Sequence, residues 1–378
     1  MMADEITVGA DPELVCYDHD NERVIDIANT VEEPMGEFGA DGHGFTAELR
    51  PKAAVYPLDL TENTRIALLK GYSLLSHCSW EAGPYIREKP LGGHVHFGIP
   101  ASDTIKETLD NMAAIMLGVL EPSETAAIRR NTIFTGRGGY VNNQGKPYGL
   151  LGDIKNKPWG FEYRTPSSFI VTPGVTTAMY TLLKALVFED AIQGPSSWTQ
   201  LDAATRKALA FKPADLYCGN RAVFLEKLGT LWPILQNLTY FKPGMEGRPL
   251  WSSLKYLLQV IEKGGFRAVP DMKDPWKITA AAAAKVTAQR PVPHRRTGQG
   301  VPVFDWNEFQ GEFLEAARQD TGMLTANAQG EIFRIINGRL VPEDTPAAEV
   351  VETPGFQELW GTEPAPTLTW SPDQIWGW

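Results

Sequence analysis

Polar and apolar side chains alternate in four short stretches of the chain, a pattern typical of β-strands with one buried face. The stretches are VGADPELVCY, GFTAELRP, GGHVHFG and WGFEYRTP. Each carries a pair of reactive side chains spaced by two, and the pairs are Asp11 and Glu13, Glu48 and Arg50, His94 and His96, and Glu162 and Arg164. Residues two apart project from the same face of a strand. We therefore predict four strands whose polar faces line one concave sheet.

Apolar residues at helical spacing predict three helices among these strands, at about residues 60–79, 105–120 and 175–186. Asp59 or Thr61 is the expected cap of the first, and a capping box of Thr104 and Glu107 opens the second. Strands and helices do not alternate regularly, and no G-x-G-x-x-G or G-x-x-x-x-G-K-[ST] motif is present. The pattern disfavours a doubly wound nucleotide-binding fold and indicates an α+β fold, with helices packed behind an antiparallel curved sheet.

The four polar pairs admit two interpretations. Strand histidines can be simple hydrogen-bonded neighbours, and a single acid is typical of a solvated surface, so four unrelated polar faces are the alternative. A solvated face would carry Lys, Thr and Ser, whereas these positions hold carboxylates, imidazoles and guanidiniums, which suit hard cations together with anionic phosphates. We therefore expect one shared site. Pro12, which cannot donate a strand hydrogen bond, predicts that the first strand is at an edge or bulged there.

Length and composition are those of a soluble protein with a large core. The 378 residues correspond to about two domains, and the hydrophobic content of 43% and charged content of 21% are ordinary. No apolar run approaches the ~20 residues of a membrane span. The N-terminal sequence begins acidic rather than basic and apolar, so we expect no secretory signal and a cytoplasmic protein.

Cysteine usage and charge exclude several classes of partner. Cys16, Cys78 and Cys218 are widely separated and form no C-x-x-C motif, so neither a disulfide framework nor a zinc-thiolate site is indicated. The net charge of −11 argues against nucleic-acid binding through the whole surface. One local basic segment, residues 277–296, is interpreted as a helix that runs into a Pro-broken loop, with anion binding as the alternative.

A loop rich in Gly, Arg, Lys and Tyr lies between the second and third helices. Its cationic residues before the strand of Glu162 include Arg129, Arg130, Arg137, Lys155 and Lys157. We predict that it covers the bound substrate and phosphates, with plain surface turns as the alternative.

After about residue 195 the pattern becomes mainly helical, with helices expected at 202–212, 219–230, 250–263, the Ala-rich run and 305–320. We predict a catalytic domain at residues 1–195, a mainly helical accessory region at 196–343 and an acidic tail at 344–378. The tail has five prolines, four tryptophans and no Lys or Arg. It is expected to pack across the body or across a partner in a homo-oligomer, with terminal disorder as the alternative.

The order of the motifs resembles the glutamine synthetase superfold: D-P-E, a later Glu, H-x-H, a basic glycine and tyrosine loop, then E-x-R-x-P. Within it, GADPEL, GHGFTAELRP, GGHVHFG, PYGLLGD and WGFEYRTPSS are most similar to the phage-type carboxylate-amine ligases, or amidoligases. Each motif is weak alone, but their order and spacing are specific over about residues 5–175. The resemblance implies a glutamine synthetase-like fold, ATP, Mg²⁺ or Mn²⁺, and the host cytoplasm if the protein is phage-encoded.

The resemblance also implies a set of metal ligands. Asp11, His94 and Glu162 would surround the metal that holds the ATP phosphates, and Glu13 and Glu48 would hold a metal near the amine and the carboxylate. An acid beside that second metal, Glu48, would take the proton of the amine. The chain differs from glutamine synthetase in having Asp at position 11 and no recognisable second acid after Glu48. How the metal nearest the amine is held is therefore left open.

Further roles follow for the cationic residues. His96, Arg137 and Lys155 would contact nucleotide phosphate, Arg164 would neutralise the transferred phosphoryl group, and Arg130 resembles the arginine that binds the substrate carboxylate. Amide formation needs an activated acyl group, which phosphoryl transfer from ATP supplies as an acyl phosphate. A metal-dependent hydrolase, a phosphagen-kinase-like phosphotransferase and a non-enzymatic virion protein stay open as alternatives. The partners expected are a small-molecule or peptide carboxylate and an amine, with no nucleic acid or membrane.

Overall fold

The computed structural model of the protein describes residues 6–131 except 32, 34, 42 and 43, residues 148–288 except 246, and the strands at 324–326, 332–336 and 339–342. The chain divides into two compact units, Met1–Ala316 and Ala317–Trp378. None of the helices in the described ranges is long and apolar enough to cross a membrane.

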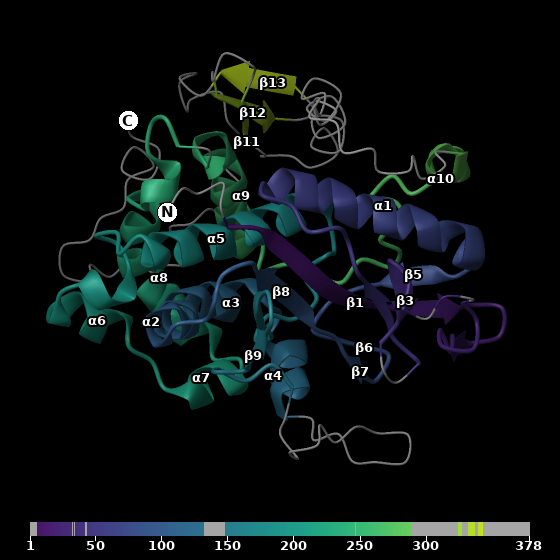
Figure 1. Ribbon diagram of the computed structural model, residues 1–378, viewed down its shortest axis with the longest axis horizontal. Coiled ribbons are helices and arrows are strands. Elements are labelled where there is room, and N and C mark those ends of the chain that lie inside the picture. The colour runs from purple at the N-terminus through teal and green to yellow at the C-terminus, as the bar shows by residue number, and fades with distance from the viewer. Residues whose placement is uncertain are drawn as a thin grey trace. The chain divides into compact units, whose positions relative to one another are not determined.

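An antiparallel sheet forms the centre of the first unit (Figure 1). Its strands follow the order β3-β4-β1-β8-β10-β9, and β2 and β5 pair with β1 as well. The bounds are β1 Val8–Asp18, β2 Arg23–Val24, β3 Phe38–Ala40, β4 Ala47–Leu49, β5 Ser79–Glu81, β8 Gly93–Phe97, β9 Ile154–Lys157 and β10 Gly160–Tyr163, with a separate hairpin of β6 Tyr85–Ile86 and β7 Lys89–Pro90. The four predicted strands are β4, β1, β8 and β10, which are consecutive neighbours. The predicted α+β class and antiparallel sheet are therefore confirmed.

Helices make up most of the rest of this unit. They are α1 Pro57–Leu75, α2 Asp103–Thr108, α3 Ala114–Leu120, α4 Ser123–Asn131, α5 Pro173–Ala191, α6 Ala203–Leu209, α7 Pro213–Tyr217, α8 Arg221–Gln236, α9 Trp251–Glu262 and α10 Ala280–Ala288. A π-helical segment, η2 Leu109–Ala113, joins α2 to α3, and 3-10 turns lie at η3 Trp198–Gln200, η4 Thr239–Phe241 and η5 Arg248–Leu250. The helices predicted near 60–79, 105–120 and 175–186 are α1, α2 to α3, and α5.

Both predicted caps are wrong. α1 begins at Pro57, and Tyr56 before it makes no capping hydrogen bond with its side chain. Proline suits this first helical position because its fixed φ is already helical and its missing N–H would have had no partner there. α2 is capped by Ser102, whose hydroxyl accepts from the Ile105 N–H at 3.0 Å. Thr104 instead donates to Asp190 at 2.7 Å and so ties α2 to α5.

The two faces of the sheet differ in chemistry. One face is apolar and fully buried, and its side chains are Val8, Ala10 and Leu14 of β1, Val95 and Phe97 of β8, and Phe161 and Tyr163 of β10. α1 packs against β1, β3 and β4, and α5 packs against α1 and is buried from Val175 to Asp190 (Figure 1). Each large apolar side chain contributes roughly 1.5–3 kcal/mol on burial. Because a slip by one residue would turn these side chains out of the core, their burial fixes the register and leaves the polar residues on the opposite face.

β1 is an interior strand over much of its length, but of the two alternatives predicted at Pro12, a local edge and a bulge, the pairing fits the local edge. β8 pairs with one side of β1, and β4 and β5 pair with the other. The Glu13 N–H bonds to the Gly92 carbonyl at 2.9 Å, so the nitrogen of Pro12, one residue earlier, faces the β4 side. Pairing with β4 begins only at Glu13. The missing N–H of Pro12 therefore falls where that ladder ends.

The second unit contains a three-stranded antiparallel sheet of β11 Leu324–Ala326, β12 Ile332–Ile336 and β13 Arg339–Pro342. These strands were not predicted and fall in the region expected to be mainly helical. The predicted helix at 305–320, the tail at 344–378 and most of the glycine-rich loop, including Arg137, lie outside the described residues. The domain boundaries at 195/196 and 343/344 stay predictions.

Candidate functional site

Strand pairing brings the predicted polar side chains together on one face of the sheet. Three pairs of these residues lie directly opposite each other on neighbouring strands: Glu13 and Glu48, Asp11 and His94, and His96 and Glu162. Opposite residues have Cβ atoms ~4.5–5.5 Å apart, so each pair is in contact range. Arg50 and Arg164 immediately follow β4 and β10 and turn back onto the same residues.

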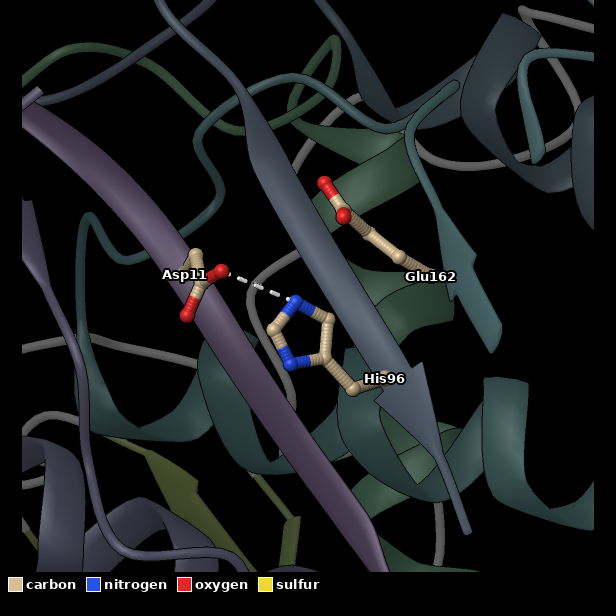
Figure 2. A group of neighbouring side chains, drawn as sticks. All are labelled: Asp11, His96 and Glu162. Atoms are coloured by element: carbon tan, nitrogen blue, oxygen red, sulfur yellow. Dashed lines mark ion pairs between the residues drawn. The ribbon is translucent and has the colours of Figure 1, made fainter. Parts of the chain in front are cut away.

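Among the described residues, Asp11, His96 and Glu162 form a group of potential metal ligands, one from each of β1, β8 and β10 (Figure 2). One ligand atom from each lies within 4.8 Å of the others, and His96 Nε2 is 3.0 Å from Asp11 Oδ2. Although His96 Nε2 is buried, it forms no hydrogen bond of good geometry with any residue that the structure describes. Two carboxylates and an unsatisfied imidazole nitrogen fit a hard divalent cation.

A second group surrounds the hydroxyl of Tyr148. This hydroxyl donates to Glu13 Oε1 at 2.6 Å and lies 2.7 Å from His94 Nε2. Glu13 Oε2 accepts from the Gly92 N–H at 2.7 Å, and His94 Nδ1 is 3.3 Å from Glu162 Oε1. Burial raises the pKa of Glu13 well above its ordinary value and lowers that of His94 well below its own. Tyr148 lies in the PYGLLGD motif of the loop predicted to cover the substrate, and no individual role was predicted for it.

Glu48 lies in a cluster of acids beside one guanidinium. Arg50 Nη2 is 2.8 Å from Glu48 Oε2 and also donates to the Ala40 carbonyl at 2.9 Å. Burial raises the pKa of Glu48 to about 8, and the charge of Asp11 adds to this effect. Asp41 raises the pKa of Glu48 further, and that of Glu13 as well. Sequence reasoning missed Asp41 because a single acid beside glycines has no periodicity.

Cationic side chains gather around Glu162. Lys157 Nζ is 2.9 Å from Glu162 Oε2, and Arg164 Nε is 3.1 Å from Oε1. Arg164 also reaches Asp153, with 3.6 Å between Nη1 and Oδ1. Lys155 is the cross-strand partner of Glu162 and is exposed. This concentration of positive charge beside carboxylates suits anionic phosphates held with a cation.

Arg129 and Arg130, at the end of α4, are both fully buried. Arg130 Nη2 lies 2.5 Å from Glu121 Oε2, and Arg129 donates to the carbonyls of Thr165 and Pro166, each at 2.9 Å. Burial lowers the pKa of Arg129 to about 10. The two arginines therefore fix the segment that follows Arg164. The role of Arg130 toward a substrate carboxylate stays a prediction, which these contacts do not favour.

A family model matches residues 8–278, which includes all the site residues described above. The chain belongs to the phage phiEco32-like COOH.NH2 ligase-type 2 family. The resemblance to phage-type carboxylate-amine ligases is thereby confirmed, and the match to this COOH.NH2 ligase family extends beyond residue 175 through the helices α6 to α9. No curated protein matches the chain.

Proposed function

We propose that this COOH.NH2 ligase is ATP-dependent, has a glutamine synthetase-like fold and forms an amide bond through an acyl phosphate. The observation that carries the proposal is the group of Asp11, His96 and Glu162, with Lys157 and Arg164 directly beside it. Carboxylates and an imidazole suit a divalent cation, and the adjoining cations suit phosphates. Membership in a carboxylate-amine ligase family supports the reaction class.

The carboxylates of the site fit Mg²⁺ or Mn²⁺ better than structural zinc because no thiolate contributes. Asp11 and Glu162, with a histidine of the H-x-H motif, would hold a cation at the ATP phosphates, and Glu13 and Glu48 would hold one nearer the amine. Such a cation, when bound, neutralises phosphate charge and so lowers the repulsion between ATP and a carboxylate. Lys155 and Arg137 are proposed as further phosphate contacts, supported for Lys155 by its exposed position opposite Glu162.

The reaction proceeds in two displacements. A carboxylate oxygen of the first substrate attacks the γ-phosphorus of ATP, the bond to the bridging oxygen breaks, and ADP leaves. Arg164 stabilises the charge on the moving phosphoryl group. The amine nitrogen then attacks the acyl carbon, phosphate leaves, and the amine proton passes to Glu48, which faces the proposed amine side of the site.

Hydroxylamine tests the proposal because it intercepts an acyl phosphate as a hydroxamate. With ATP, Mg²⁺ and a mixture of candidate carboxylates, we expect ADP, phosphate and a hydroxamate. Arg164→Lys keeps the charge but loses the planar fork, and loss of one such contact costs ~2.7 to 4 kcal/mol, a roughly 10²- to 10³-fold slower rate. The control is Arg65→Lys, which alters a surface arginine paired with Glu62 and should leave the rate unchanged.

Other products would identify other chemistry. AMP and pyrophosphate would mean activation as an adenylate, and a phosphorylated guanidino product would mean a phosphagen-kinase-like reaction. A complete absence of ATP turnover over a broad set of carboxylates and amines would favour a non-enzymatic protein. An Arg164→Lys variant with the wild-type rate and melting temperature would show that Arg164 does not act on the phosphoryl group.

A further inference from the structure

The Arg164 guanidinium lies between two carboxylates that differ in their surroundings. Its Nε is 3.1 Å from Glu162 Oε1, and its Nη1 is 3.6 Å from Asp153 Oδ1. Glu162 belongs to the group of candidate metal ligands, whereas Asp153 does not. A cation that binds at Glu162 draws on the charge that this carboxylate presents to Arg164. Asp153 is then the one of the two whose charge remains available to the guanidinium.

The backbone places Asp153 directly opposite Arg164. The Arg164 N–H donates to the Asp153 carbonyl at 2.9 Å, which continues the β9–β10 ladder by one residue beyond the pair of Tyr163 and Ile154. Opposite residues of an antiparallel pair project from the same face, so Asp153 lies on the polar face with Lys155. The proximity of the two side chains therefore follows from the strand register.

The turn before Asp153 is fixed by two contacts. Gly149 has a φ of +76°, and a Cβ atom there would overlap the guanidinium of the buried Arg129. Only glycine therefore allows this turn to approach the arginine without strain. In addition, the Thr165 hydroxyl donates to the Leu150 carbonyl at 2.8 Å. Asp153 thus projects from a supported backbone, which a positioning side chain requires.

The charge of Asp153 alone would have the opposite effect on phosphate binding. A carboxylate near a phosphate site repels the phosphates, so its removal would strengthen their binding. A carboxylate that orients a guanidinium toward a phosphate has the reverse effect, because its removal lets the guanidinium turn away. The Arg164 side chain is 27% exposed and therefore has room to leave the site.

We propose that Asp153 is a positioning residue that orients the Arg164 guanidinium toward the transferred phosphoryl group. The inference rests on the proposed function in one respect, namely the action of Arg164 on that group. Asp153 itself contacts neither the phosphoryl group nor the cation. It acts through Arg164 alone, as residues that support a site commonly do.

Two nucleotides measure this effect without knowledge of the carboxylate substrate. ADP lacks the γ-phosphoryl group, and adenylyl imidodiphosphate carries it in a form that resists transfer. The ratio of the Kd for ADP to that for the analogue, from calorimetry on the full-length protein with Mg²⁺, reports what the γ-phosphoryl group adds to binding. Asp153→Asn keeps the shape of the side chain and removes its charge. We expect the ratio to fall roughly 3- to 10-fold, within the range of coupling between neighbouring residues.

A double-mutant cycle tests whether the effect depends on Arg164. Arg164→Gln should lower the ratio as well, and Asp153→Asn should then lower it no further, because the guanidinium that Asp153 orients is absent. Asp153→Glu retains the charge and should recover part of the wild-type ratio. Glu62→Gln is the matched control, since it removes the carboxylate of an arginine pair on α1, and it should leave both Kd values unchanged.

A wild-type or higher ratio in Asp153→Asn would overturn the inference, since removal of the charge would then only relieve repulsion. An equal fall of the ratio in the Arg164→Gln background would do the same, as would an equal loss of affinity for both nucleotides together with a lower melting temperature. If the wild-type protein binds the two nucleotides equally, or Arg164→Gln keeps the wild-type ratio, the proposed role of Arg164 is wrong and the inference fails with it.

Discussion

Asp110 is a half-buried carboxylate of η2 whose Oδ1 has no hydrogen-bond partner among the described residues. Burial raises its pKa to about 6, and the nearby charge of Asp153 adds to this effect. The folded state therefore binds a proton more tightly than the unfolded state, whose carboxyl titrates near pH 3.9. Asp110 therefore contributes most to the stability of the folded protein below about pH 3.9. This contribution is lost as the pH rises through about 6, because the buried carboxyl must then ionise.

We expect Asp110→Asn to stabilise the protein by about 1 to 3 kcal/mol at pH 7 and to have little effect near pH 4, since an amide needs no ionisation. Urea unfolding at pH 4, 5, 6 and 7 measures this difference. Asp103→Asn, at a carboxylate that is 93% exposed on the neighbouring α2, should follow the wild type at each pH. A constant difference between Asp110→Asn and wild type across this range would contradict the assignment.

Sequence patterns identified the site residues that lie on strands. They missed the site residues that only the tertiary fold brings close to the others. Asp11, His96 and Glu162 were visible because alternation marks the face of a strand. Tyr148 lies outside any strand or helix and Asp41 follows the three-residue β3, so neither has a periodic signal. The Tyr148 hydroxyl contacts both Glu13 and His94, and no local pattern encodes these contacts.

At the scale of elements, hydrophobic spacing located the helices but not the details of their ends. The predicted apolar stripe at 105–120 is buried, yet the helix passes through η2, where the Leu109 carbonyl also accepts from Tyr163. At α2, three candidate capping residues stand in a row, Ser102, Asp103 and Thr104, and only the tertiary contacts decide among them. At α1, by contrast, the expected caps Asp59 and Thr61 lie inside a helix that begins at Pro57. Thr104, for example, bonds to Asp190 of α5 rather than capping α2.

The end of α4 provides a prediction about the arginine proposed to bind substrate. Arg130 is 1% exposed and paired with Glu121, which also accepts from the Ser167 N–H at 2.9 Å and its hydroxyl at 2.8 Å. Removing one partner of a buried pair leaves an uncompensated charge and costs roughly 3–5 kcal/mol. We expect Arg130→Met to lower the free energy of unfolding by this amount, as measured by urea titration.

A double variant distinguishes a structural role of Arg130 from a role in substrate binding. Arg130→Met with Glu121→Gln removes both charges and should recover part of the lost stability. Ile128→Met, at an exposed position of the same helix, should leave stability unchanged. If Arg130→Met keeps the wild-type stability and raises only the KM for the carboxylate, Arg130 binds substrate as the resemblance implies.

At the scale of the molecule, local pattern predicted an antiparallel sheet but not its strand order, since pairing of β1 with β4, β5 and β8 joins segments far apart in sequence. The family match covers residues on both sides of the boundary predicted at 195/196, and that boundary stays a prediction. The fold buries its large core on the helix-covered face of the sheet, away from the candidate metal ligands. Folding therefore has a source of stability that does not depend on a metal ion.

This separation predicts how the whole protein responds to a chelator. We expect EDTA to abolish nucleotide binding, followed by calorimetry with ADP, while the circular dichroism spectrum stays that of the folded protein. Cys16, Cys78 and Cys218 are free thiols, and none is near enough to the group of Asp11, His96 and Glu162 to form part of it, so no zinc-thiolate site is lost. Adding Mg²⁺ or Mn²⁺ back should restore binding, and cation at 100 times its Kd should stabilise the fold by about 2.7 kcal/mol. Global unfolding in EDTA, or unchanged ADP binding in metal-free protein, would show that the cation has a different role.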